Sequence, residues 1–141
     1  MTKGRGFFGS KTAQTADGNR PPGAGEAKAV NRTKGTEIAL RLEVADSPSK
    51  RSKGLLGRNE LPYGSGIWIV PCESVHTFWM RFSIDLIYID RGLRVKKVSH
   101  CVKPWRISAC LSASSVIELP CGAIAQSKTE VGDELEIVTC R

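Results

Sequence analysis

The chain has 141 residues, which is enough for one domain of ordinary size. Its formal net charge of +7 suggests a nucleic-acid partner, but most of the charge lies at one end. Residues 1–35 hold seven Lys or Arg against two acidic residues, whereas the rest of the chain holds fourteen basic and twelve acidic residues. Because residues 36–141 are nearly neutral, they would attract nucleic acid only weakly, and we expect no such partner.

The sequence also predicts neither secretion nor a membrane span, and it lacks the cysteine spacing of a redox or zinc site. No apolar segment near Met1 has the length of a signal peptide, and no run is long enough to span a membrane. The five cysteines are odd in number, and no two have the C-x-x-C spacing of a redox or zinc site. We therefore expect a cytoplasmic protein without a cofactor, whose thiols are reduced and unligated. The cysteines are Cys72, Cys101, Cys110, Cys121 and Cys140.

Residues 1–35 differ in composition from the rest of the chain. They contain seven of the fourteen glycines and a Pro21-Pro22 pair, with few aliphatic side chains. Such a segment buries too little apolar surface to offset the entropy of ordering it. We predict a disordered, basic, Gly-rich arm over 1–35 and a single globular domain over 36–141.

The first predicted elements of that domain are a strand and a short helix. Apolar and polar residues alternate in TEIALRLEVA, residues 36–45, which is the period of a strand with one face on a core. Ser47 is suited to cap a helix and Pro48 to occupy its first position, so a short basic helix should follow and stop by Gly57. The apolar run GIWIV then predicts a strand that Pro71 ends.

The second half of the domain predicts a β-hairpin and two further strands. Residues 84–89 are a β-prone apolar run, and the turn at 90–92 leads into a strand that reaches Val98. Residues 99–114 lack clean periodicity and are expected to be a long loop or irregular edge. Strands are expected at 115–120 and 134–138, with helical turns between them. Together these elements predict a compact, β-dominated α+β domain with five or six short strands and one or two short helices. The strands are expected to form a mostly antiparallel sheet or a partly closed barrel.

Asp85 is the residue of the central strand that most needs an explanation. A carboxylate buried on both faces of a sheet is costly unless another group pairs with it. Four residues of straight strand span roughly 13 Å, so Arg81 reaches Asp85 only if the chain bends near Phe82 and Ser83. Otherwise its partners must be Arg106, His76 or backbone N–H groups. We predict that Asp85 is satisfied in one of these ways.

Polar and aromatic residues around this strand predict a small ligand-binding cleft. An apolar cleft with a few convergent polar groups is the usual composition of a ligand site. The protein is therefore interpreted as a binding module for a small molecule or another protein, with its oligomeric state left open. The candidate residues are His76, Trp79, Met80, Arg81, Asp85, Trp105 and Arg106.

A hydrolase and a metal site are the alternatives to a binding module. In a hydrolase, His76 and Asp85 would act as acid and base while Arg81 holds a small anionic substrate, but no nucleophile motif such as G-x-S-x-G is present. In a metal site, Cys72 and His76 would need help from His100, Cys101 or Cys110, and their spacing is not that of ligand pairs. We predict no metal.

The chain also resembles a known family, the uncharacterised "domain of unknown function 192" proteins. The resemblance covers most of residues 51–137 and includes a departure at Ser83, where the family pattern often has proline. It implies a small β-rich domain, and because no activity is established for the family, no catalytic residues can be carried over to this chain. The matching motifs are RSKGLLGR, LPYGSGIWI, HTFWMRFSIDLIYID, KPWRIS, VIELPCG and VGDELEI.

Overall fold

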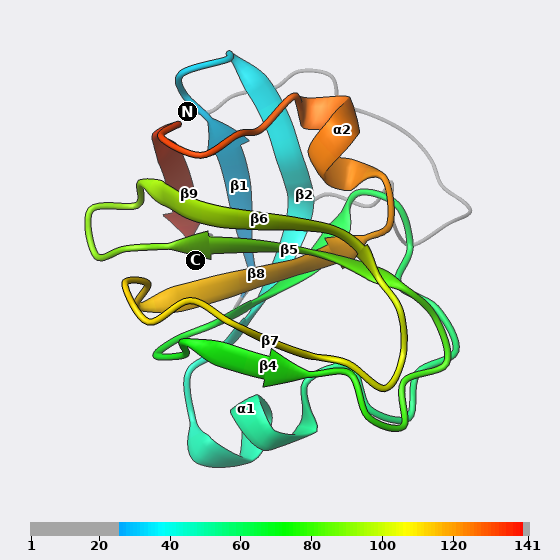
Figure 1. The fold of residues 1–141 in the computed structure, drawn as a ribbon. Coiled ribbons are helices and arrows are strands. Elements are labelled where there is room, and N and C mark those ends of the chain that lie inside the picture. Colours follow the sequence, from blue (N-terminus) through cyan, green and yellow to red (C-terminus); the bar gives the residue numbers. More distant parts are fainter. Residues whose placement is uncertain (1–25, 140–141) are drawn as a thin grey trace.

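The structure is a computed structural model, and it describes residues 26–139. The described chain forms nine strands and two short helices (Figure 1). The strands are β1 (Glu26–Asn31), β2 (Thr36–Ala45), β3 (Ser65–Ile69), β4 (Ser74–His76), β5 (Ile84–Ile89), β6 (Val95–Val102), β7 (Ile107–Ala109), β8 (Ser115–Pro120) and β9 (Leu135–Thr139). The helices are α1 (Pro48–Lys53) and α2 (Ala123–Ser127).

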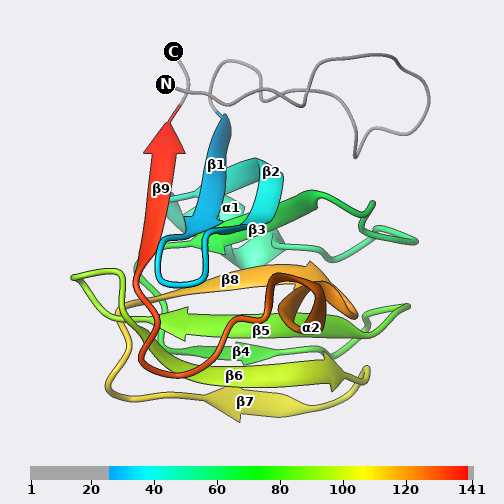
Figure 2. The same cartoon turned by 90° about the horizontal axis from the view of Figure 1, so that it is seen from above.

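Seven of the strands form one curled sheet in the order β6-β5-β8-β3-β2-β1-β9, and β4 pairs with β7 in a separate small sheet (Figure 2). All strand pairs are antiparallel except β2 with β3. The two edges of the large sheet meet at one end, where the Val95 N–H donates to the Asp133 carbonyl and the Leu135 N–H to the Leu93 carbonyl, both at 2.9 Å. The predicted class, a β-dominated α+β domain with a partly closed sheet, is confirmed, although the strands number nine instead of five or six.

Both faces of the large sheet are buried, and each face has its own core. On β5, Ile87 and Ile89 belong to a core that includes Ile124 of α2. Leu86 and Tyr88 point the other way, into a core with residues of the α1 region and of the β4 segment. Because side chains alternate along a strand, a strand covered on both faces appears in the sequence as an unbroken apolar run. This explains why all six residues of β5 are buried.

The sheet begins earlier than the sequence analysis expected. Residues 26–31 form β1, which pairs with both β2 and β9, and Ala27, Ala29 and Asn31 are completely buried. The Asn31 amide donates to Thr129 Oγ1 at 3.0 Å and to Asp133 Oδ2 at 2.9 Å. Residues 26–35 therefore belong to the folded domain and not to an arm. The rest of the arm prediction concerns residues 1–25, which lie outside the described part of the chain.

Helix α1 follows its predicted caps. The Ser47 hydroxyl accepts from the Lys50 N–H at 3.3 Å, and Pro48 opens the helix. The helix ends sooner than the Gly57 stop that we expected, because Gly54 has a φ of 45°, a left-handed value that favours glycine. None of the helices that the structure describes is long and apolar enough to cross a membrane.

The expected long loop over residues 99–114 contains the end of one strand and the whole of another, seven of its sixteen residues. Strand β6 continues to Val102, and β7 pairs with β4 with Val75 opposite Ser108. Strand β7 lies at the margin of the molecule away from β1 and β9, whereas β4 is drawn between β5 and β6 (Figure 2). Periodicity missed β7 because it is only three residues long and its outward residues are the more apolar ones, the reverse of an ordinary surface strand.

Candidate functional site

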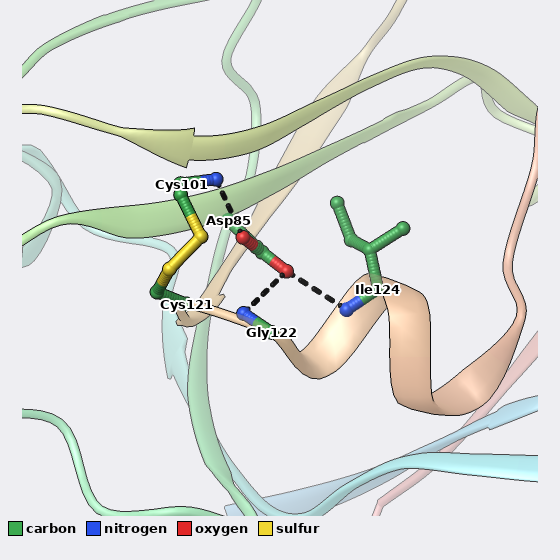
Figure 3. Close-up of a disulfide and its surroundings, with 5 residues drawn as sticks. All are labelled: Asp85, Cys101, Cys121, Gly122 and Ile124. Carbon is green, nitrogen blue, oxygen red and sulfur yellow. Dashed lines mark hydrogen bonds between the residues drawn. A yellow bond between two sulfur atoms is a disulfide. The ribbon is translucent and has the colours of Figure 1, made fainter.

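Asp85 is satisfied entirely by backbone N–H groups. Its side chain is fully buried, and one carboxylate oxygen accepts from the Cys101 N–H at 2.7 Å. The other accepts from the N–H groups of Gly122 and Ile124 at 3.1 and 2.8 Å (Figure 3). Arg81 is exposed and donates instead to the Asn59 side chain at 2.6 Å. Of the alternatives that the sequence left open, the structure therefore selects backbone donors.

A disulfide joins Cys101 and Cys121 beside this carboxylate (Figure 3). The prediction that all the cysteines are reduced is therefore wrong. The strand register explains the pairing: Ile84 lies opposite both Val102 on β6 and Pro120 on β8, so the two cysteines reach the same end of β5. Sequence spacing hid the pairing because the cysteines are separated by 20 positions. A disulfide is typical of oxidising compartments, so the support that reduced thiols gave to a cytoplasmic location is removed.

Asp85 and the two cysteines also come close enough for a metal ion to be considered. Their ligand atoms all lie within 4.8 Å of one another. The sulfurs are bonded to each other, however, and therefore offer no thiolate to a metal. Cys72 and Cys110 are the free cysteines of the described residues, and Cys140 lies outside them. The Asp85 cluster holds β6, β5 and the start of α2 together and serves the fold.

A second buried carboxyl group lies on the opposite face of the sheet. Glu118 on β8 stands opposite Leu86 on β5 and Ile67 on β3, so it points into the core beneath α1. Only 6% of its surface is exposed. Within residues 26–139, no protein group hydrogen-bonds its carboxyl group. This isolation contrasts with Asp85, whose oxygens have three donors.

Glu118 lies in the lining of a pocket of about 320 Å³. The walls come from elements far apart in the sequence: the end of α1 and the residues after it, the end of β3, the β4 strand and Met80. Gly54 lies near the carboxyl group, since a Cβ built on it would be 4.0 Å from Glu118 Oε1. The apolar lining residues are Leu55, Leu56, Ile69, Val75 and Met80, and the polar ones include Arg51, Lys53, Cys72, His76 and Glu118.

Burial controls the acidity of Glu118. Loss of hydration raises the pKa of its carboxyl group to about 7, while the positive charge of Arg58 opposes that rise. Arg58 is itself engaged by Glu43, to which its guanidinium donates two hydrogen bonds of 2.8 and 2.9 Å. With a pKa of about 7, the Glu118 carboxyl group changes its protonation state near neutral pH, at the wall of this pocket.

The thiol and the imidazole at this pocket are held in less reactive states. Burial raises the pKa of the Cys72 thiol, and its Sγ donates to the Ser74 carbonyl at 3.0 Å. A thiol with a raised pKa carries little thiolate and is a poor nucleophile. His76 is exposed, and its Nδ1 accepts from the Phe78 N–H at 3.3 Å. Neither side chain has the paired base or acid that nucleophilic catalysis requires.

The candidate residues from the sequence divide among three places. His76 and Met80 line the pocket. Trp79, Arg81, Trp105 and Arg106 are exposed at the surface. Asp85 lies on the opposite face of the sheet from Glu118, so the structure does not bring together the His76 and Asp85 of the hydrolase alternative.

Sequence reasoning missed Glu118, although a usable signal was present. The residue interrupts the apolar run VIELP, just as Asp85 interrupts IDLIYI. A carboxyl group within a run that is buried on both faces is costly in either strand. The same argument that selected Asp85 also applied to Glu118.

A row of stacked rings leads from the pocket to the surface. His76 stacks on Phe78 with ring centroids 4.8 Å apart, and Phe78 stacks on Trp105 at 5.7 Å. Trp79 then meets Trp105 edge to face at 4.6 Å. The pocket thus opens beside an aromatic surface.

These features define a class of protein: a small, partly closed β-sheet domain with one carboxyl group buried for the fold and another facing a pocket. The chain belongs to the DUF192 family, described as uncharacterised, whose profile matches residues 29–137. It is 36% identical over 116 residues to a UPF0127 protein of Pyrococcus abyssi, covering 78% of this chain and 97% of that protein. A UPF0127 protein of Thermococcus sibiricus is 34% identical over 113 residues, covering 76% of this chain and 72% of the relative.

The fold is shared with a solved structure. A Novosphingobium aromaticivorans protein of unknown function matches with a TM-score of 0.65 at 20% identity, covering 89% of this chain and 99% of that one. At this level of identity the similarity shows the fold alone. The family and the fold expected from the sequence motifs are thus confirmed.

Proposed function

We propose that the protein is a binding module whose small ligand enters the pocket beneath α1 and donates a hydrogen bond to Glu118. The observation that carries this proposal is a carboxyl group that is 6% exposed, faces a pocket and has no hydrogen-bonding protein partner in the described chain. Buried polar groups are normally hydrogen-bonded, and an exception needs an explanation. A ligand that supplies the missing donor provides one.

The composition of the pocket favours binding over hydrolysis. Its volume of about 320 Å³ suits a small organic molecule, and its walls combine apolar and polar side chains in similar shares. A hydrolase would need an activated nucleophile or a positioned water, and the nearest thiol, Cys72, has a raised pKa. The hydrolase alternative is further weakened because Asp85 is committed to three backbone donors.

The charges around the pocket define the chemistry of its ligand. Glu118 is placed to accept from an N–H donor at the inner end, and Leu55 and Met80 are placed to contact an apolar body. Arg51 and Lys53 also line the pocket, so an acceptor oxygen at the other end of the ligand would find cationic partners. The ligand we propose therefore combines an amine or amide, a short apolar portion and an acceptor group.

A fragment titration followed by ¹⁵N NMR tests this proposal. At about pH 8, where Glu118 is ionised, n-butylammonium and butanamide should shift the amide signals of Glu118, Leu55 and Val75. Butyrate, which lacks a donor, should not shift the Glu118 signal. Glu118→Gln should weaken n-butylammonium binding by about tenfold, whereas Glu73→Gln, which changes an exposed acid, should not. Equal responses to all three fragments, or an unchanged affinity in Glu118→Gln, would overturn the proposal.

A further inference from the structure

The β7 segment turns its apolar side toward solvent. Trp105, Ile107 and Leu111 are 52%, 73% and 80% exposed, and Ala109 between them is also exposed. These four residues alternate in sequence with Arg106, Ser108 and Cys110, of which the last two are partly covered. An ordinary surface strand has the opposite polarity. We name the set of Trp79, Trp105, Ile107, Ala109 and Leu111 the β7 face.

Backbone conformation holds both tryptophans on this face. Trp79 is 70% exposed and packs edge to face against Trp105. Each of the two residues has a φ of 68°, in the left-handed region that bulky side chains rarely adopt. Backbone strain of this kind persists where the surrounding structure enforces it, and it is concentrated at functional sites. The backbone conformation at Trp79 and Trp105 thus costs stability, while both indole rings remain exposed to solvent.

The charged residues within the segments that carry the β7 face are basic, and one exposed acid, Glu73, lies beside them, because its carbonyl accepts from the Cys110 N–H at 2.8 Å. Residues 74–83 and 99–112, the segments that carry the face, contain Arg81, Lys103 and Arg106 and no Asp or Glu. All three of these basic residues are exposed. Glu73, just before the first segment, is the nearest acidic residue in the sequence. An occupant that complements the face is therefore apolar at its centre and anionic at its margin.

We propose that the β7 face docks on the interface of an anionic lipid bilayer. Tryptophan rings favour the level of the lipid headgroups, Ile and Leu side chains favour the acyl boundary beneath, and Arg and Lys pair with lipid phosphates. A second copy of the chain complements the face less well, because both copies would bring the same basic residues, Lys103 and Arg106, to one interface. This inference rests on the outer surface and not on the Glu118 pocket.

Vesicle co-sedimentation of the full chain tests the proposal. The protein should bind vesicles of phosphatidylcholine with about one-fifth phosphatidylglycerol, bind pure phosphatidylcholine vesicles more weakly, and dissociate as salt rises to about 0.5 M. Ile107→Ser with Leu111→Ser, and separately Trp79→Gly with Trp105→Gly, should each lower the partition coefficient by about tenfold or more. Lys103→Gln with Arg106→Gln should remove the preference for phosphatidylglycerol.

Matched controls separate docking from a general effect of the substitutions. Val131→Ser changes another exposed aliphatic residue, and Lys96→Gln changes an exposed lysine on β6, and neither should alter binding. Each variant should first show the amide spectrum of a folded protein, so that loss of binding reports the surface. Absence of binding to phosphatidylglycerol vesicles, or equal binding by the β7-face variants and the parent, would overturn the proposal. Concentration-dependent dimerisation that the β7-face variants abolish would also overturn it, because the occupant would then be a second copy.

Discussion

Two carboxyl groups on the neighbouring strands β5 and β8 are buried, but only one of them is hydrogen-bonded by the described residues of the protein. Asp85 is surrounded by three backbone donors, whereas Glu118 has only the distant charge of Arg58 to offset its burial. A carboxyl group that loses its hydration and gains no hydrogen-bond donor is more stable when protonated. The difference separates a structural residue from a candidate functional one.

Asp85→Ala should lower the free energy of unfolding by roughly 2 to 4 kcal/mol, because it leaves three N–H groups with no acceptor in the interior. Arg81→Ala is the matched comparison, and it should cost no more than about 0.5 kcal/mol because Arg81 is exposed and donates its hydrogen bond to the Asn59 side chain. Urea denaturation followed by circular dichroism measures both values. An Asp85→Ala protein as stable as the parent would show that the carboxylate does not anchor β5.

Substitutions at Trp79 separate the cost of its backbone from the contribution of its ring. Glycine and alanine both remove the indole, but only glycine adopts a φ of 68° without strain. Trp79→Gly should therefore be more stable than Trp79→Ala by about 1 kcal/mol, as measured by urea denaturation of the two variants. Equal stability would indicate that Trp79 does not hold the left-handed conformation.

At the scale of elements, the sequence predicted those strands whose pattern is set locally. β2 alternates, while β3, β5 and β8 are apolar runs, and each was located within a few residues. β1, β4 and β7 were missed because they are short or contain small residues, and their stability comes from partners far along the chain. β1, for example, pairs with β9 about a hundred residues later, which no local period reveals.

The disulfide between Cys101 and Cys121 should contribute measurably to the stability of the domain. Cys101 and Cys121 enclose a loop of 20 residues, for which the loss of chain entropy in the unfolded state corresponds to about 3 kcal/mol. Cys121→Ser should lower the free energy of unfolding by about 3 kcal/mol. A reductant should destabilise the parent but not this variant. Thermal denaturation with and without a dithiol measures the effect. A parent whose melting temperature is unchanged by the reductant would contradict the assignment.

At the scale of the whole molecule, the two faces of the sheet have different roles. The face toward α2 is a closed core that includes Asp85, and the face toward α1 contains the pocket with Glu118. Of the candidate site residues, His76 and Met80 line the pocket, and their role in binding a ligand stays a prediction. Trp79 and Trp105 were grouped with them because they are near in sequence, but the backbone at φ 68° turns these residues to the surface. Sequence proximity does not reveal which face of a layer a side chain occupies.

Glu118 should make the stability of the whole domain depend on pH. Its pKa is raised to about 7 in the folded state and is close to 4.5 in the unfolded chain, so the folded state binds more protons between these values. The free energy of unfolding therefore falls as pH rises through this window, by roughly 3 kcal/mol from Glu118 alone. The difference in free energy of unfolding between Glu118→Gln and the parent should therefore grow in favour of the variant, by roughly 3 kcal/mol, as pH rises from about 4.5 to about 7. Parallel stability curves for the two proteins, measured by urea denaturation, would rule this out.

The most direct test of a functional carboxyl group at Glu118 is its own titration in the folded protein. The ¹³C chemical shift of the side-chain carboxyl, followed by NMR from acid to alkaline pH, should give a midpoint of about 7 for Glu118. Saturation with n-butylammonium should lower that midpoint, because a bound cation favours the ionised form. A midpoint near the ordinary glutamate value of 4.5 would contradict the account, since it would show that the carboxyl group is hydrated or already paired.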